Sequence, residues 1–192
     1  MKQTPIKKVC FFGHANTPED HVEYLDTVES ARLLAQAGYT IVNGGGPGIM
    51  KAATVGAHKG GGKAIGVTLY PDGSDELVSF EGRDTENTFD EEVVTTTYVA
   101  RTLKLIELGD IFVTMNGGTG TVSEFGMTWG LARLHFGQHE DLILYGSWWH
   151  EIMEAFAKNM HIREEALKVY HIVDTPADVL DMINNINHQR GF

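Results

Sequence analysis

The sequence predicts an α/β fold of the Rossmann-like kind, a three-layer sandwich in which helices cover both faces of a mostly parallel sheet. Short apolar segments alternate along the chain with segments whose apolar residues recur at helical spacing. Such an alternation requires parallel strands joined by right-handed crossovers. The apolar segments at residues 112–115 and 142–145 lack a polar face, which is typical of strands buried on both sides. With 192 residues and no linker, repeat or low-complexity tract, the chain is expected to form one domain over residues 1–192.

The first three elements follow from the N-terminal pattern. The apolar run Val-Cys-Phe-Phe at residues 9–12 ends at Gly13, which is typical of a strand followed by a turn. Over residues 20–37 the apolar positions recur at helical spacing, and Gly38 stands where this helix is expected to stop. Residues 39–42 are aromatic and β-branched, and they predict the second strand.

The next helix and strand come after a glycine cluster. Residues 49–58 predict a helix that three further glycines end, and residues 64–68 predict the third strand. Residues 70–92 break the rhythm with proline, glycine and acidic side chains, and they predict a surface excursion. We interpret its acidic part, residues 84–92, as a solvated loop or lid.

The alternation resumes after this excursion and continues to the end of the chain. Leu105 and Leu108 lie on one face of a predicted helix, with Arg101 and Lys104 close by. The elements expected in this half are strands at 93–97, 110–115, 141–145 and 169–173, and helices at 98–108, 122–136, 148–159 and 176–187.

Charge and composition exclude several functional classes. Lys and Arg total 15 against 26 Asp and Glu, and the net charge of −11 repels phosphate backbones, so no nucleic-acid polymer is expected as a partner. No apolar run approaches the ~18 residues of a membrane span, and the basic N-terminus precedes too short an apolar run for a secretory signal. The single cysteine, Cys10, cannot form an internal disulfide. We therefore expect a cytoplasmic protein with no membrane partner.

Two glycine-rich turns follow predicted strands, and each opens onto a predicted helix. They are GGGPGIM at residues 44–50 and GGTGTVSE at residues 117–124. Both fall at the carboxyl ends of strands, where ligands of an open parallel sheet bind. Glycine lets backbone N–H groups approach a ligand closely, and a helix N-terminus adds partial positive charge. The pair predicts a phosphate site, against the alternative of two tight turns without a ligand.

Neither turn matches the common nucleotide motifs. A P-loop needs a lysine followed by serine or threonine after its second glycine, and neither turn has this pair. The dinucleotide fingerprint belongs after the first strand, where this chain has only Gly-His-Ala-Asn at residues 13–16. A P-loop NTPase and an NAD-dependent oxidoreductase are therefore disfavoured.

Together with Arg101, fifteen residues before Asn116, the two turns resemble those of the LOG family, also called "lysine decarboxylase-like" proteins. The resemblance spans residues 9 to about 136. It implies a Rossmann-like fold and a homodimer, and no cofactor is expected. It also implies hydrolysis of the N-glycosidic bond of a nucleoside 5′-monophosphate, such as a cytokinin nucleotide or AMP, to free base and ribose 5-phosphate. No lysine stands where a pyridoxal Schiff base would be expected, so the decarboxylase name has no support.

The resemblance also implies roles for individual residues. Arg101 and Glu124 match the catalytic positions of the family. The positions that would hold the phosphate and line the nucleotide pocket are Gly117, Gly118, Thr119, Gly120 and Thr121 in the second turn, and Gly13, His14, Gly45, Gly46, Gly48 and Met50 around the first.

The implied chemistry suits these residue types. Cleavage of the C1′–N bond builds positive charge on the ribose, and a carboxylate at Glu124 can stabilise that charge and orient the attacking water. Arg101 stays charged and can pair with Glu124, hold the phosphate, or do both. The alternative is a noncatalytic carrier of a nucleotide or of molybdenum cofactor on the same fold. The departures from the family pattern at Asn116, Thr102 and His14 suit that alternative.

Other residues support weaker hypotheses. His135 and His139 are four residues apart but lack a third ligand at suitable spacing, so no metal site is expected. Ser123 and Cys10 lack an adjacent base, so nucleophilic catalysis is not supported. The helices at 98–108 and 122–136 carry apolar residues beyond one face, which predicts a covered second face and agrees with the implied homodimer.

Overall fold

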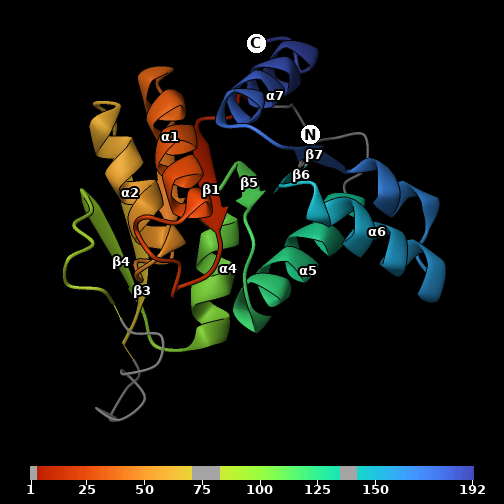
Figure 1. Cartoon of the computed structure of the whole chain (residues 1–192), viewed down its shortest axis with the longest axis horizontal. Helices are drawn as coiled ribbons and strands as arrows, with labels where there is room; N and C mark the ends of the chain where they lie inside the picture. Colours follow the sequence, from red (N-terminus) through yellow and green to blue (C-terminus); the bar gives the residue numbers. More distant parts are fainter. Residues whose placement is uncertain (1–3, 71–82, 135–141) are drawn as a thin grey trace.

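The computed structural model describes residues 4–70, 83–134 and 142–192, and within them seven parallel strands form one sheet between two layers of helices (Figure 1). The sheet order is β4-β3-β2-β1-β5-β6-β7. None of the helices in these ranges has the length and apolar character needed to span a membrane. The elements are β1 (Lys8–Phe12), α1 (Val22–Gln36), β2 (Thr40–Asn43), α2 (Ile49–Lys59), β3 (Ala64–Leu69), β4 (Glu91–Thr95), α4 (Tyr98–Leu108), β5 (Ile111–Thr114), α5 (Thr119–Leu134), β6 (Leu142–Tyr145), α6 (Trp148–Asn159), the 3₁₀ helix η1 (Glu164–Lys168), β7 (Tyr170–Val173) and α7 (Pro176–Gln189).

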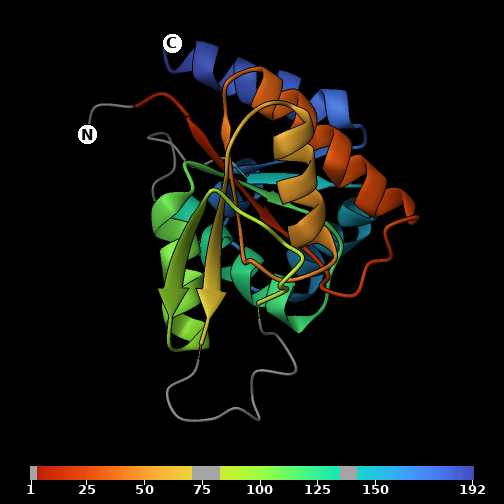
Figure 2. The ribbon, with the colours of Figure 1, turned by 90° about the vertical axis from the view of Figure 1, so that its left-hand side faces the viewer.

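The two faces of the sheet are buried in separate cores. Val9 and Phe11 of β1 pack into a cluster with α1, α2 and α7, while Cys10 and Phe12 pack with α4, α5 and α6. Figure 2 shows the same layering, with α2 and α4 on opposite sides of the sheet. Because side chains alternate between two buried faces, the strands are apolar on both sides. The expected Rossmann-like α/β sandwich is confirmed.

The acidic segment before β4 differs from its sequence interpretation. β4 begins at Glu91, two residues earlier than expected, and pairs with β3 at the edge of the sheet. Most of residues 84–92 are exposed, but Asn87 is buried, Phe89 packs against the core and the last two residues belong to β4, so the interpretation of this segment as a solvated loop or lid holds only in part. The periodicity gave no sign of this because a single aromatic anchor, Phe89, fixes the segment. Residues 71–82 of the expected excursion lie outside the described residues.

The second glycine turn also differs from expectation, because it forms part of a helix. α5 begins at Thr119, whereas the sequence placed its start at residue 122. Residues 135–136 of the expected helix and residue 141 of the expected strand lie outside the described residues, as do His135 and His139. The remaining elements begin and end within two residues of their expected positions.

The strand order places a switch point at β1. The chain runs from β1 through β2 and β3 to β4 on one side, and β5 then pairs with β1 on the other side. At such a point the loops after neighbouring strands diverge and leave a crevice at the carboxyl ends. The segments that follow β1 and β5 meet there, since His14 N donates to the Asn116 carbonyl at 3.0 Å.

Candidate functional site

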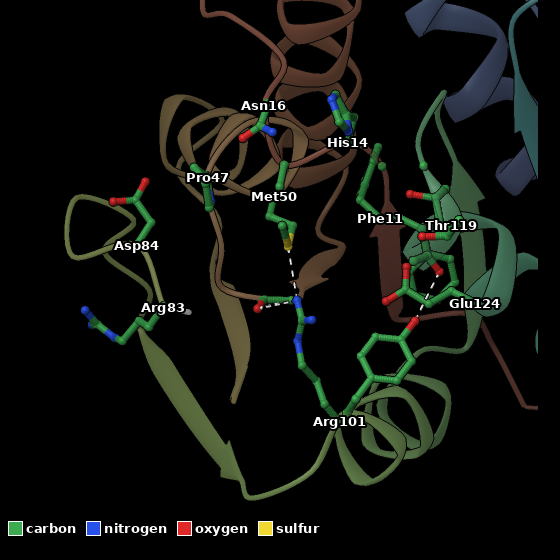
Figure 3. Close-up of a pocket in the computed structure, with 18 residues that line it drawn as sticks. Phe11, His14, Asn16, Pro47, Met50, Arg83, Asp84, Arg101, Thr119 and Glu124 are labelled. Carbon is green, nitrogen blue, oxygen red and sulfur yellow. Dashed lines mark hydrogen bonds between the residues drawn. The ribbon is translucent and has the colours of Figure 1, made fainter. Parts of the chain in front are cut away.

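A cavity of about 640 Å³ opens at the carboxyl ends of β1 and β5 (Figure 3). This volume lies in the range of pockets that bind small molecules or cofactors. The predicted site residues that line it are Gly13, His14, Met50, Arg101, Gly118, Thr119, Gly120, Thr121 and Glu124. The predicted site residues that do not line it are Gly45, Gly46, Gly48 and Gly117.

The second glycine turn presents backbone donors to this cavity. Gly118 precedes α5, and the first four N–H groups of a helix have no partner within the helix. These N–H groups and the helix dipole favour an anion at this end. Gly117 does not line the cavity but allows the turn to pack closely, because a Cβ at this position would lie 2.1 Å from Thr121 Oγ1. A phosphate is therefore a chemically suitable guest beside Gly118–Thr121.

Hydrogen bonds and close contacts within the chain fix the first glycine turn, and the residues of this turn that line the cavity are not the predicted glycines. Asn43 accepts from Gly45 N at 2.9 Å and donates to Thr54 Oγ1 at 2.9 Å. Gly48 has φ +61°, and a Cβ there would lie 2.4 Å from the His14 carbonyl oxygen, so only glycine suits this close approach. Gly44 and Pro47 line the cavity instead of the predicted glycines.

The loop before β4 explains the orientation of the first turn. The Gly45 carbonyl accepts from Asp84 N at 3.1 Å, and the Gly46 carbonyl accepts from Asn87 Nδ2 at 2.8 Å. A Cβ on Gly45 would meet Thr68 at 2.6 Å. These two glycines therefore serve the packing of the turn against its neighbours.

Arg101 is buried and bonded to the backbone around the first turn. Its Nε donates to the Val67 carbonyl at 3.1 Å, and its Nη2 donates to the Gly44 carbonyl at 2.8 Å and contacts Met50 Sδ at 3.3 Å. The side chain is 5% exposed, and Figure 3 shows it directed at Met50. A surface ion pair is therefore the wrong description of Arg101. It links α4, β3 and the first glycine turn, and it forms part of the cavity wall.

Gly44 is required by this arrangement and offers a test of it. Gly44→Ala is expected to lower the free energy of unfolding by about 1–3 kcal/mol, because the new Cβ would lie 2.0 Å from Arg101 Nη2. Gly118→Ala is the matched control, since a Cβ there meets nothing within 4 Å. Urea denaturation of both variants measures the difference, and equal stabilities would contradict the role given to Gly44.

Glu124 lies in the second turn of α5, 8% exposed, and lines the cavity. Its charge also acts on Cys10 beneath the site. Burial raises the pKa of the Cys10 thiol well above its usual value, Glu124 raises it further, and Arg101 lowers it. The charges of Glu124 and Arg101 thus both act on the Cys10 thiol, which is buried in β1, and this thiol stays protonated.

Several lining residues were missed by sequence reasoning. Asn16, Pro47, Arg83, Asp84 and Tyr98 line the cavity together with Gly44. Tyr98 had a readable signal, because it precedes Arg101 by three residues and so shares its helical face. Asp84 had none, because its position depends on the contact with Gly45. Among the described residues, no group of three metal-ligating side chains gathers.

Comparisons with known proteins agree with this fold. A model of the SLOG cluster4 family matches residues 7–165. A solved molybdenum cofactor binding protein from the phototrophic bacterium Rippkaea orientalis is similar, with a TM-score of 0.67, 21% identity, and 97% of this chain and 99% of that chain covered. The structural-genomics target TM1055 gives a TM-score of 0.70 at 22% identity, covering 94% of this chain and 100% of that one. The molybdenum cofactor carrier protein of Chlamydomonas reinhardtii gives 0.63 at 19%, covering 96% and 98%. These identities show a shared fold alone, and no curated protein matches the chain.

Proposed function

Because the chain belongs to the SLOG cluster4 family, we propose that its cavity is the active site of a nucleoside 5′-monophosphate phosphoribohydrolase. The reaction consumes one water, breaks the bond between C1′ of the ribose and the base nitrogen, and releases free base and ribose 5-phosphate. AMP and cytokinin-type nucleotides are the substrates that we consider first.

One observation carries this proposal: the N-terminus of α5 and the Glu124 carboxylate line the same cavity. Thr119 and Glu124 are five residues apart on one helix, which corresponds to about 7.5 Å along its axis. A ribose 5-phosphate has a phosphate at one end and C1′ toward the other. A phosphate at the α5 N-terminus would therefore bring C1′ toward Glu124.

The chemistry then divides among the residues by charge. As the C1′–N bond breaks, positive charge grows on the ribose and negative charge on the departing base. The Glu124 carboxylate stabilises the cation and accepts a proton from the water that attacks C1′. The departing base takes up a proton, so the charges balance. Arg101 fixes the wall that carries Gly44 and Met50 opposite this carboxylate.

The second candidate is a noncatalytic carrier of a nucleotide or of molybdenum cofactor. Two features favour it: two structural neighbours bind or carry this cofactor, and Arg101 donates to the backbone carbonyls of Val67 and Gly44, which gives it a structural role. Such a carrier needs the donors of α5 but no carboxylate at C1′.

The two candidates differ in one measurement. The purified protein is incubated with a panel of nucleoside 5′-monophosphates, and chromatography detects free base. Release of base from one or more of them supports the hydrolase. Binding of a nucleotide or of molybdenum cofactor without release supports the carrier, and no binding at all contradicts both.

We further propose a homodimer formed through α4 and α5. These helices leave Val99, Leu103, Val122, Met127 and Leu134 exposed, although Phe125 and Trp129, also on α5, pack into the chain's own core. Large exposed apolar side chains on two adjacent helices are typical of a covered interface.

Sedimentation tests the dimer. The unaltered protein is expected to sediment as a dimer at micromolar concentration, and Leu103→Glu, which puts a charge at a 51% exposed position, is expected to shift it to a monomer. Leu25→Glu is the matched control, because Leu25 is 54% exposed but lies on α1. A monomeric unaltered protein, or equal behaviour of the two variants, would contradict this interface.

A further inference from the structure

Tyr98, the first residue of α4, lines the same cavity as Arg101 and Glu124. Its hydroxyl forms a short hydrogen bond with Ser123 Oγ and lies 3.4 Å from the Gly120 carbonyl oxygen. Ser123 Oγ donates to the same carbonyl at 2.9 Å. Tyr98 thus joins the start of α4 to the first turn of α5, between the turn proposed for the phosphate and the carboxylate proposed for C1′.

The protons of this cluster determine what Tyr98 offers to a ligand. The two hydroxyl groups hold one proton each, and the carbonyl can only accept. The distances favour one arrangement: Ser123 donates to Gly120 at 2.9 Å and Tyr98 donates to Ser123, because 3.4 Å from the Tyr98 hydroxyl to the Gly120 carbonyl is long for an O–H···O bond. This arrangement uses both protons inside the cluster. The Tyr98 oxygen keeps a lone pair, so toward a ligand Tyr98 acts as a hydrogen-bond acceptor.

We propose that Tyr98 accepts a hydrogen bond from a ribose hydroxyl of the substrate, and that this contact makes the site selective for ribonucleotides over deoxyribonucleotides. The inference rests on the nucleotide substrate proposed above. A phosphate dianion carries only acceptors, so it requires the N–H groups of α5 and not the lone pair of Tyr98. The sugar is the part of a nucleotide that passes from the α5 N-terminus to Glu124, and its hydroxyls can donate.

The test compares AMP with 2′-deoxyAMP and 3′-deoxyAMP. The unaltered protein is expected to show a kcat/KM for AMP about three- to tenfold above that for at least one deoxy analogue, the effect of one hydrogen bond. Tyr98→Phe keeps the ring and removes the acceptor. This variant is expected to lower kcat/KM for AMP to the level of that analogue and to leave kcat/KM for the analogue unchanged.

Ser123→Ala is the matched control, because it removes one hydroxyl from the cluster but keeps the Tyr98 oxygen, so the preference for AMP should persist. If Tyr98 had a purely structural role, Tyr98→Phe would lower kcat/KM for all three substrates alike, so an unchanged selectivity in this variant overturns the inference. An unaltered protein that does not discriminate between AMP and the deoxy analogues overturns it as well. If no nucleotide is hydrolysed, calorimetric Kd values for the same three compounds decide. Ribose selectivity that is lost in Tyr98→Phe then supports the contact while the hydrolase proposal fails. If none of the three binds, both are overturned.

Discussion

Glu124→Gln is expected to lower kcat for AMP by about 10²–10³-fold while the protein stays folded. The magnitude is that of losing one preorganised electrostatic group that acts on charge developing in the transition state. Glutamine has nearly the size of glutamate but cannot neutralise the ribosyl cation or accept a proton from water. Glu124 is 8% exposed, so bulk solvent screens its carboxylate less than it would an exposed one. Initial rates of adenine release, with thermal unfolding as the check on folding, measure the effect.

A second glutamate provides the control for this substitution. Glu151 is an exposed residue of α6 and does not line the cavity, so Glu151→Gln should leave both kcat and KM unchanged. If the carboxylate acts mainly in the transition state, Glu124→Gln should change kcat far more than KM. A folded Glu124→Gln variant with near-normal kcat would contradict the catalytic role assigned to Glu124.

The fold was predictable because the sequence patterns that specify its strands and helices are local. Each strand and helix carries its own apolar period, and alternation of the two restricts the topology to a parallel sheet. The errors have two causes. Phe89 shows a distant contact overriding the local pattern, since it lies in a polar, acidic segment and is fixed by packing against the core. The early start of α5 shows local ambiguity, because glycines at a helix N-terminus look like a turn in the sequence.

The site was predictable to the extent that its residues lie next to strand ends. The second turn met this condition, and its residues from Gly118 to Thr121 line the cavity. The first turn also follows a strand, β2, but the sequence could not show which of its residues face the cavity, because its orientation depends on partners far along the chain. Gly44 meets Arg101 57 positions later, and Gly45 meets Asp84. Motif matching identified these glycines but could not tell which of them face a ligand.

The largest remaining effect concerns the 5′-phosphate, which the site should require. AMP is expected to exceed adenosine at least 10²-fold in kcat/KM, or in affinity if no turnover is seen. The protein carries a net charge of −11, so attraction of an anion must come from local donors and not from the overall field. Charge-assisted hydrogen bonds contribute about 1.5–3 kcal/mol each, so two of them account for this selectivity.

A single backbone donor can be removed to locate that effect. Thr119→Pro deletes the N–H of the first residue of α5, a position where proline fits helical geometry, whereas Thr119→Ala keeps the N–H and removes the same side-chain hydroxyl. Relative to Thr119→Ala, the proline variant should bind AMP about tenfold or more weakly and bind adenosine equally. Because the two variants differ at this site in one donor, that pattern would assign the phosphate to the α5 N-terminus. Equal values for AMP and adenosine in the unaltered protein would mean that the turn holds no phosphate, and the proposed nucleotide substrate would fall with it.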